Sequence, residues 1–158
     1  MTTAAEQAGA VIDARGAMLE TLELQRKAFR AEGFPEYGTR IDRIDRCIAL
    51  LVDNQKAICD ALSADYGCRS PYITRMAEIM TSVGNLKHVK KKLKSWMKPE
   101  RRSAPVPMNL FGARALVYHQ PKGVVGVIGA WNFPLYLSVG PLVAALAAGN
   151  RVMIKMSE

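Results

Sequence analysis

The sequence predicts an α/β protein in which an N-terminal helical layer is followed by the first βαβ unit of a parallel sheet, which is incomplete. Apolar residues recur every three or four positions through most of the first part of the chain, as in amphipathic helices. Prolines then gather around residue 100. Finally, a strand, a helix and a strand fit within about 30 residues. We therefore expect a helical segment over 1–100, a linker with a strand or hairpin over 101–122, and the start of a βαβ domain over 123–158.

The composition of the 158 residues is that of a folded protein, with 49% hydrophobic and 23% charged residues. These fractions exclude a wholly disordered, collagen-like or low-complexity chain. The length suits one domain, or one domain and part of another. The net charge of +8 leaves a polyanionic partner open.

Three helices are predicted in the first segment. One covers much of 4–31 and ends before Gly33 and Pro35. A second runs over 41–62 with apolar residues on one face. A third begins after Ser70, an N-cap, with Pro71 in its first position, and ends before Pro99. Its predicted apolar stripe comprises Tyr72, Met76, Ile79, Val83, Leu86, Val89 or Lys90, Leu93 and Met97.

Beyond residue 100 the pattern changes. Prolines predict an extended, irregular crossing over 101–107, and a strand follows over 113–120. The continuous apolar run 124–128 is typical of a strand covered on both faces, as in parallel sheets. A helix is predicted over 142–148, ended by Gly149-Asn150, and a further strand over 151–156. This order predicts the beginning of a Rossmann-like sheet.

Most of the positive charge lies in one segment. Residues 87–102 hold eight Lys or Arg residues and a single acid, Glu100. Such a cluster could bind nucleic acid or an anionic membrane as a basic helical module. It could equally be a solvated helix end, where the helix dipole favours cations. A third hypothesis is a scaffolding chain that pairs with a partner along the open strand 151–156.

The sequence shows no secretory leader pattern in its first residues. The uncharged stretch 124–150 is interrupted by Asn132, Pro134 and Pro141, so it predicts a buried core and no membrane span. The three cysteines form no CxxC pair, which suits a reducing, cytoplasmic location. We expect each to be a small buried residue, and we predict no metal site.

Polar residues follow both strands of the predicted βαβ unit. Asn132 comes after the first strand, and Lys155 and Glu158 come at the end of the second. Ligands bind beyond the carboxyl ends of parallel strands, so these side chains should face one crevice. An amide donor, a cation and a carboxylate suit a polar ligand with hydroxyl or phosphate groups. The alternatives are that Asn132 is a turn residue beside a helix and that Lys155 is a solvated strand end.

Three short sequence segments resemble those of a known enzyme family. The segments 131–135 (WNFPL), 147–150 (AAGN) and 155–158 (KMSE) resemble, in order and spacing, the NAD(P)-dependent aldehyde dehydrogenase superfamily. The segments 65–70 (DYGCRS) and 96–99 (WMKP) are similar to the coniferyl aldehyde dehydrogenase branch, which is class 3-like. The resemblance covers roughly 19–158.

The resemblance implies a role for five residues. Asn132 would help form the oxyanion hole, Lys155 and Glu158 would hold the adenosine ribose of NAD or NADP, and Ile128 and Trp131 would line the cofactor cleft. It also implies a small-molecule aldehyde substrate, a homodimer, and a covalent mechanism. In that mechanism a Cys thiolate adds to the aldehyde, hydride passes to the nicotinamide, and a Glu-activated water releases the carboxylic acid.

The sequence departs from the family pattern in three ways. Ala130 and Met156 stand where many relatives have Pro, and Met156 leaves the pose of Glu158 less constrained. Glu158 favours a free ribose 2′-hydroxyl, but a side chain that swings away would admit NADP too. No cysteine matches the nucleophile, and the general-base Glu is absent. We therefore expect an N-terminal piece of the enzyme, inactive alone, with no nucleic-acid partner.

Overall fold

The computed structural model describes the backbone of residues 4–157 and the side chains of residues 14–157. Its α-helices are α1 (Ala4–Glu32), α2 (Tyr37–Asp53), α3 (Gln55–Asp65), α4 (Pro71–Ile73), α5 (Thr81–Trp96) and α6 (Pro134–Ala147). Its strands are β1 (Glu100–Arg102), β2 (Ala115–Val117), β3 (Val124–Ile128) and β4 (Arg151–Lys155). A π-helix, η1 (Thr74–Met80), joins α4 to α5, and a 3-10 helix, η2 (Met108–Phe111), lies between β1 and β2.

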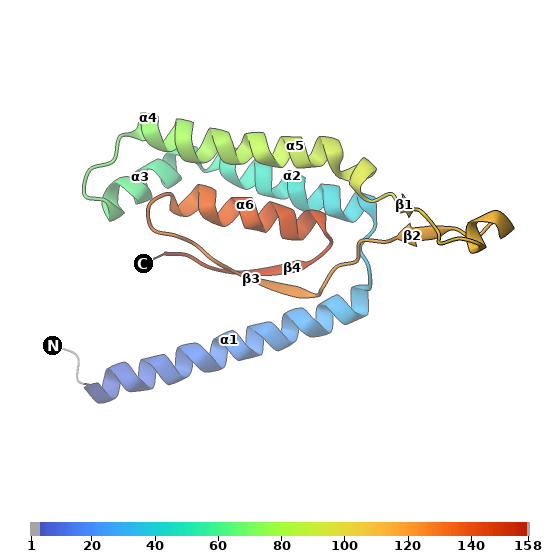
Figure 1. Ribbon diagram of the computed structural model, residues 1–158. Coiled ribbons are helices and arrows are strands. Elements are labelled where there is room, and N and C mark those ends of the chain that lie inside the picture. Colours follow the sequence, from blue (N-terminus) through green and yellow to red (C-terminus); the bar gives the residue numbers. More distant parts are fainter. Residues whose placement is uncertain (1–3, 158) are drawn as a thin grey trace.

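Strands β3 and β4 form a parallel pair connected by α6, which confirms the predicted α/β class and the βαβ unit. In Figure 1, α6 covers one face of this pair, α1 lies along the other face, and α2 and α5 form a further layer beyond α6. The main core lies between α2, α5 and α6. It is formed by buried apolar side chains that include Ile44, Leu86, Leu93 and Val143.

Helix α6 contains no charged residue, and a charged side chain from the helical layer caps each of its ends. At the start, a Glu78 carboxylate oxygen accepts the backbone N–H groups of Leu135 and Tyr136 at 2.8 and 3.2 Å. At the other end, Arg40 donates to the carbonyl of Ala147 at 2.8 Å. An anion at a helix N-terminus and a cation at its C-terminus both complement the helix dipole. The helical layer thus fixes the position of the βαβ unit.

The C-terminus of α6 follows the sequence prediction. Gly149 has a φ of +89° and ends the helix, since this left-handed conformation suits glycine. A Cβ at this position would lie 2.9 Å from the Arg40 guanidinium, so the close approach also requires glycine. The N-terminus differs, because α6 begins at Pro134 and not at Leu142. Proline is favourable in the first turn of a helix, and the helix also accommodates Pro141.

The segment predicted as one helix over 41–62 forms two helices, α2 and α3. The prediction of a single continuous helix was therefore wrong. The break falls at Asn54, whose φ of −106° and ψ of 18° depart from helical values. Its side chain donates to the carbonyl of Leu50 at 2.8 Å, and the Gln55 side chain donates to that of Val52 at 3.0 Å. Such local hydrogen bonds compete with the helix and favour its interruption.

The predicted stripe of the third helix holds from Ile79 onward but fails before it. Tyr72 is 70% exposed and Met76 is 41% exposed, whereas Thr74 and Glu78 are completely buried. The reason is the π-helix η1, whose wider turn shifts the buried face relative to the 3.6-residue pattern. Ser70 does precede the helix, with Pro71 in its first position, but the Ser70 side chain makes no capping hydrogen bond.

The linker forms an arm with an antiparallel strand pair, as the predicted strand or hairpin over 101–122 indicated, and residues 103–107 form neither helix nor strand. β1 pairs antiparallel with β2, with Arg101 opposite Leu116. The strand predicted over 113–120 is limited to Ala115–Val117. In Figure 1 the arm projects from the helical layers. Apolar side chains near its tip are strongly exposed, including Val106 (76%), Leu110 (77%) and Phe111 (84%).

Candidate functional site

The parallel pairing brings four of the five predicted site residues to one edge. Ile128 lies opposite Lys155 at the carboxyl ends of β3 and β4, and Trp131 and Asn132 follow in the next loop. The Ile128 side chain is 82% exposed and that of Trp131 is 70% exposed, so this edge is open. Glu158 lies outside the described residues. The structure thus places these four residues at one exposed edge of the strand pair.

A cavity of about 580 Å³ opens at this edge. Its lining comes from three separate segments: the end of α3 (Asp65 and Tyr66), the loop and start of α6 (Trp131 and Pro134), and Ser157 after β4. A cavity of this size at the carboxyl ends of parallel strands is a typical position for a small molecule or cofactor in an α/β protein.

Gly129 allows α6 to approach the end of β3. Its N–H donates to the carbonyl of Lys155 at 2.9 Å, which extends the strand pairing by one residue. A Cβ on this residue would lie 2.4 Å from the Ser138 Oγ, and that hydroxyl is buried and donates to the carbonyl of Pro134 at 2.7 Å. The glycine at this position is therefore required by packing.

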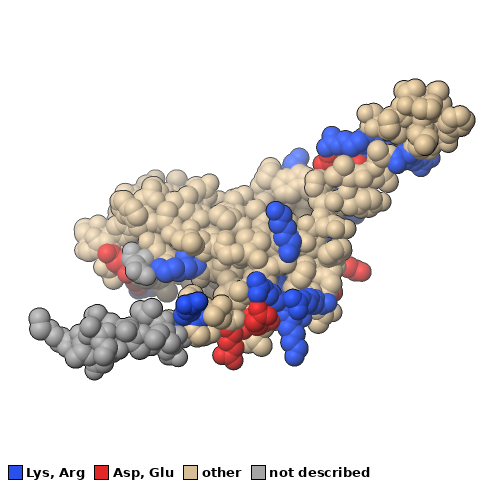
Figure 2. Space-filling view, turned by 60° about the horizontal axis from the view of Figure 1, so that its bottom comes forward, with Lys and Arg blue, Asp and Glu red and all other residues tan. Residues whose placement is uncertain are grey.

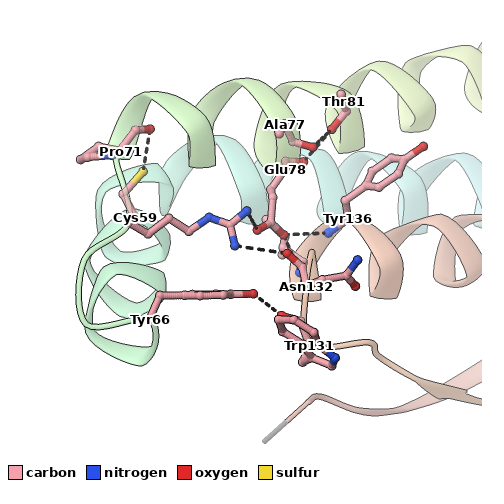
Figure 3. Close-up of polar contacts among 11 residues, drawn as sticks. Cys59, Tyr66, Pro71, Ala77, Glu78, Thr81, Trp131, Asn132 and Tyr136 are labelled. Carbon is pink, nitrogen blue, oxygen red and sulfur yellow. Dashed lines mark hydrogen bonds and ion pairs between the residues drawn. The ribbon is translucent and has the colours of Figure 1, made fainter.

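The loop that carries Trp131 and Asn132 is held by the helical layer. The Tyr66 hydroxyl donates to the carbonyl of Trp131, and Arg69 Nη1 lies 3.4 Å from the carbonyl of Asn132, within hydrogen-bonding range. Figure 3 shows Tyr66, Trp131, Asn132 and Glu78 gathered where this loop meets the helices. These contacts hold the backbone carbonyls of the loop and do not involve the side chains of Trp131 and Asn132.

Arg69 is itself anchored by a buried acid. Its Nη2 lies 2.9 Å from Glu78 Oε1, and the two side chains are 9% and 0% exposed. The Arg69 guanidinium also lies 4.6 Å from the centre of the Tyr66 ring and 5.3 Å from that of Phe133, within cation–π range. These contacts connect α3, η1 and the loop before α6 in one network.

Sequence reasoning missed Glu78 and the role of Arg69. Glu78 falls in a helix that the periodicity treated as ordinary, so nothing local marked it as buried. One indirect signal exists: α6 begins at Pro134 with Phe133 as its N-cap, and neither residue has a side-chain oxygen to accept a backbone N–H. A helix start without a local cap indicates that an acceptor must come from elsewhere in the fold.

The cysteines differ in their surroundings. Cys59 is buried and its Sγ lies 3.8 Å from the carbonyl of Pro71. Cys47 is half-buried, and burial raises the pKa of its thiol, which disfavours the thiolate. Cys68 is exposed, so the expectation that all three are buried was wrong for this residue. Within the described part of the chain, no group of three His, Cys, Asp or Glu residues is arranged to hold a metal ion.

The basic segment 87–102 is partly neutralised by its neighbours. Lys90 pairs with both carboxylate oxygens of Asp45 at 2.6 and 2.7 Å, which ties α5 to α2. Arg102 pairs with Glu100, which also contacts His119 at 3.0 Å. Figure 2 views the molecule from the side of α1, away from α5, and on that face several Lys and Arg side chains lie next to acidic ones. Lys90 and Arg102 are thus held in ion pairs within the fold.

The geometry defines a class of protein: an α/β protein with a cavity at the carboxyl ends of parallel strands. A helical layer packs against the loop at this edge. Residues 14–158 match the aldehyde dehydrogenase family, and the chain belongs to that family. It is 46% identical over 145 residues to a probable coniferyl aldehyde dehydrogenase of Caulobacter vibrioides, a match that covers 91% of this chain and 30% of the relative. The chain thus spans under a third of that relative's length.

Solved structures show the same fold. A substrate-bound aldehyde dehydrogenase of Staphylococcus aureus has a TM-score of 0.80 and 25% identity over 89% of this chain and 30% of its own. An NAD-dependent benzaldehyde dehydrogenase of Corynebacterium glutamicum has a TM-score of 0.68 and 29% identity over 84% of this chain and 28% of its own. In the described residues, no helix combines the length and the apolar character needed to cross a membrane.

Proposed function

We propose that this chain is the part of an NAD(P)-dependent aldehyde dehydrogenase that holds the cofactor and supplies one oxyanion donor. The observation that carries the proposal is the common edge of β3 and β4, which brings Ile128 and Lys155 together beside the loop of Trp131 and Asn132. A cavity lined in part by Trp131 opens at this edge. The high identity to a probable coniferyl aldehyde dehydrogenase favours an aromatic aldehyde such as coniferyl aldehyde as substrate, and the corresponding carboxylic acid as product.

The residues at this edge fit a dinucleotide. Lys155 provides a cation for hydroxyl or phosphate oxygens, and the exposed Ile128 provides an apolar surface beside it. When bound, NAD or NADP would accept a hydride from the substrate. Glu158 would accept from a ribose hydroxyl, and Trp131 would line the same cleft. These residues bind and orient the cofactor, and they do no chemistry themselves.

Asn132 has a different role in the proposal. Its side-chain amide donates to the oxygen of the aldehyde as negative charge develops on it, which lowers the barrier to nucleophilic attack. The nucleophilic thiol and the general base would come from the rest of the whole protein. This assignment agrees with the raised thiol pKa of Cys47 and the burial of Cys59, neither of which suits a nucleophile.

Aldehyde-dependent formation of NADH by the whole protein tests the proposal. With coniferyl aldehyde, we expect turnover with NAD⁺, NADP⁺ or both, and a KM for the cofactor that rises at least several-fold in Lys155→Ala. Lys91→Ala, an exposed lysine in α5, is the matched control and should leave both constants unchanged. Absence of aldehyde oxidation with a range of aldehydes and both cofactors would refute the proposal.

Further proposals concern the oligomeric state, the location, the partners and the segments of the protein. We propose a homodimer, and the exposed apolar tip of the β1–β2 arm supports it, since such a surface is unfavourable in water. We also propose a cytoplasmic protein without a nucleic-acid partner, divided into segments 1–100, 101–122 and 123–158. Light scattering of the whole protein checks the homodimer, and a DNA titration at low salt checks the absence of a nucleic-acid partner.

A further inference from the structure

Trp131, Asn132 and Phe133, which precede α6, all contact the helical layer. None of these contacts uses the side chain of Asn132. Tyr66 holds the carbonyl of Trp131, Arg69 lies beside the carbonyl of Asn132, and the Phe133 ring lies against the Arg69 guanidinium. Asn132 is exposed, while its backbone is constrained on both sides. These contacts fix the backbone of Asn132, the residue whose side-chain amide is the proposed donor.

The anchor for this arrangement is buried and charged. Glu78 is completely buried, and one of its oxygens accepts from two backbone N–H groups in the first turn of α6, while the other pairs with Arg69. Burying a carboxylate is unfavourable unless it is paired and hydrogen-bonded; Glu78 Oε2 is hydrogen-bonded, and Oε1 lies in the ion pair with Arg69. Glu78 therefore fixes Arg69 and the first turn of α6 relative to each other, and the Asn132 loop lies between them.

We propose that Arg69 and Glu78 are positioning residues for the oxyanion donor, acting on the reaction through the backbone of Asn132. This inference rests on the proposed function, because it concerns the same amide. An oxyanion donor acts only if it lies at about 2.7–3.1 Å from the position of the developing charge. Displacement of a catalytic group by about 1 Å can cost about 10²-fold in rate. Arg69, paired with Glu78, contacts the backbone carbonyl of Asn132 and so restricts displacement of the amide.

A double-mutant cycle in the whole protein tests the inference. The variants are Arg69→Met, Asn132→Ala and the two combined, and the measured quantity is kcat with saturating cofactor and aldehyde. We expect Asn132→Ala to lower kcat by about 10²–10³-fold and Arg69→Met to lower it by about 10–10²-fold. In the Asn132→Ala background, Arg69→Met should lower kcat by less than about threefold, because the group that it positions is already absent.

The control is Arg75→Met, which removes an exposed arginine from the π-helix that carries Glu78, and it should leave kcat unchanged. Arg69→Lys keeps the charge but not the planar fork that spans Glu78 and the Asn132 carbonyl, so we expect only partial recovery relative to Arg69→Met. The KM for the cofactor should change little in either Arg69 variant, since a general loss of structure would raise KM and lower kcat together.

Backbone amide hydrogen exchange over residues 129–137 of the whole protein gives a readout that is independent of activity. Arg69→Met should accelerate exchange in this loop at least tenfold while leaving the centre of α5 protected. Arg75→Met should change neither. If Arg69→Met unfolds the chain, the milder Arg69→Lys is measured in the same way, and its loop exchange should rise by a smaller factor.

The outcomes separate the two proposals. If Asn132→Ala leaves kcat unchanged, the proposed function of Asn132 fails. If Asn132→Ala is strongly impaired but Arg69→Met has the same effect in both backgrounds, the proposed function stands and the positioning inference is overturned. Unchanged loop exchange in Arg69→Met would also overturn it.

Discussion

The carboxylate of Glu78 lies 2.8 Å from the backbone nitrogen of Leu135, although the two residues are 57 positions apart in the chain. This contact joins the π-helix η1 to the first turn of α6. It replaces the local side-chain cap that α6 lacks. The position of the loop before α6 thus depends on a residue of the helical layer, which links the two parts of the chain at the candidate site.

Removal of the Glu78 carboxylate should strongly destabilise the fold. Glu78→Ala leaves the Arg69 guanidinium buried without a counter-charge, and breaking a buried pair in this way costs about 3–5 kcal/mol. Glu78→Gln keeps one acceptor for the N–H groups of α6 and should cost less. Urea unfolding measures both. Asp60→Ala, which breaks an exposed pair with Lys56, should cost much less, because solvent screens that pair.

An equal loss in Glu78→Ala and Asp60→Ala would contradict the importance of the buried pair. The combined variant Arg69→Met/Glu78→Gln should be less destabilised than the sum of its two single changes, because it leaves no isolated buried charge. A purely additive double variant would show that the two side chains act independently.

Gly129→Ala should destabilise the junction of β3 and α6. The new Cβ would lie 2.4 Å from the Ser138 Oγ, and overpacking of this kind costs about 1–3 kcal/mol. Adding Ser138→Ala removes that oxygen and should restore part of the loss. Gly126→Ala is the matched control, since a Cβ at Gly126 would meet nothing within 4 Å. Thermal unfolding measures all three, and equal melting temperatures for Gly126→Ala and Gly129→Ala would contradict the packing argument.

Acidification should weaken the attachment of α1. Glu32 pairs with Arg43 of α2 and, at 3.0 Å, with Arg151 of β4. The hydrogen bond from Arg43, aided by the charges of Arg43 and Arg151 and opposed by burial, holds the pKa of Glu32 below its ordinary value of 4.5. Because the folded pKa is depressed, this contribution to stability is complete above pH 4.5 and is lost as the pH falls through the folded pKa.

The free energy of unfolding against pH measures this effect. The stability difference between the natural protein and the Glu32→Gln variant should be largest near neutral pH and should shrink as the pH falls below 4.5. Glu20→Gln, at an exposed position on α1, serves as the control. A stability difference between the natural protein and the Glu32→Gln variant that stays constant from neutral pH to acid would contradict the assignment.

The order of elements and the edge at which the site lies could be predicted because both depend on local patterns. The apolar run 124–128, the Gly149-Asn150 stop and Lys155 at a strand end are each marked by a few neighbouring residues. The parallel pairing then brings Ile128 and Lys155 together without further information. The part of α6 over 134–141 was missed because Gly140 and Pro141 disfavour a helix by local propensity.

The remaining features depend on contacts between distant segments. Nothing near Glu78 shows that it caps a helix 57 residues later. The π-helix shifts the buried face so that Tyr72 and Met76 are exposed, and a 3.6-residue pattern cannot represent such a shift. The pairing of β1 with β2 places Arg101 opposite Leu116 across a loop whose prolines suggested irregular chain.

The rate of hydride transfer in a single turnover, measured for Asn132→Ala in the whole protein, tests the central claim most directly. Asn109→Ala, which replaces an exposed asparagine on the arm, is the control. The account predicts a rate lowered about 10²–10³-fold with an almost unchanged Kd for the cofactor, since the amide acts on the developing charge. A single-turnover rate equal to that of the natural protein would contradict it.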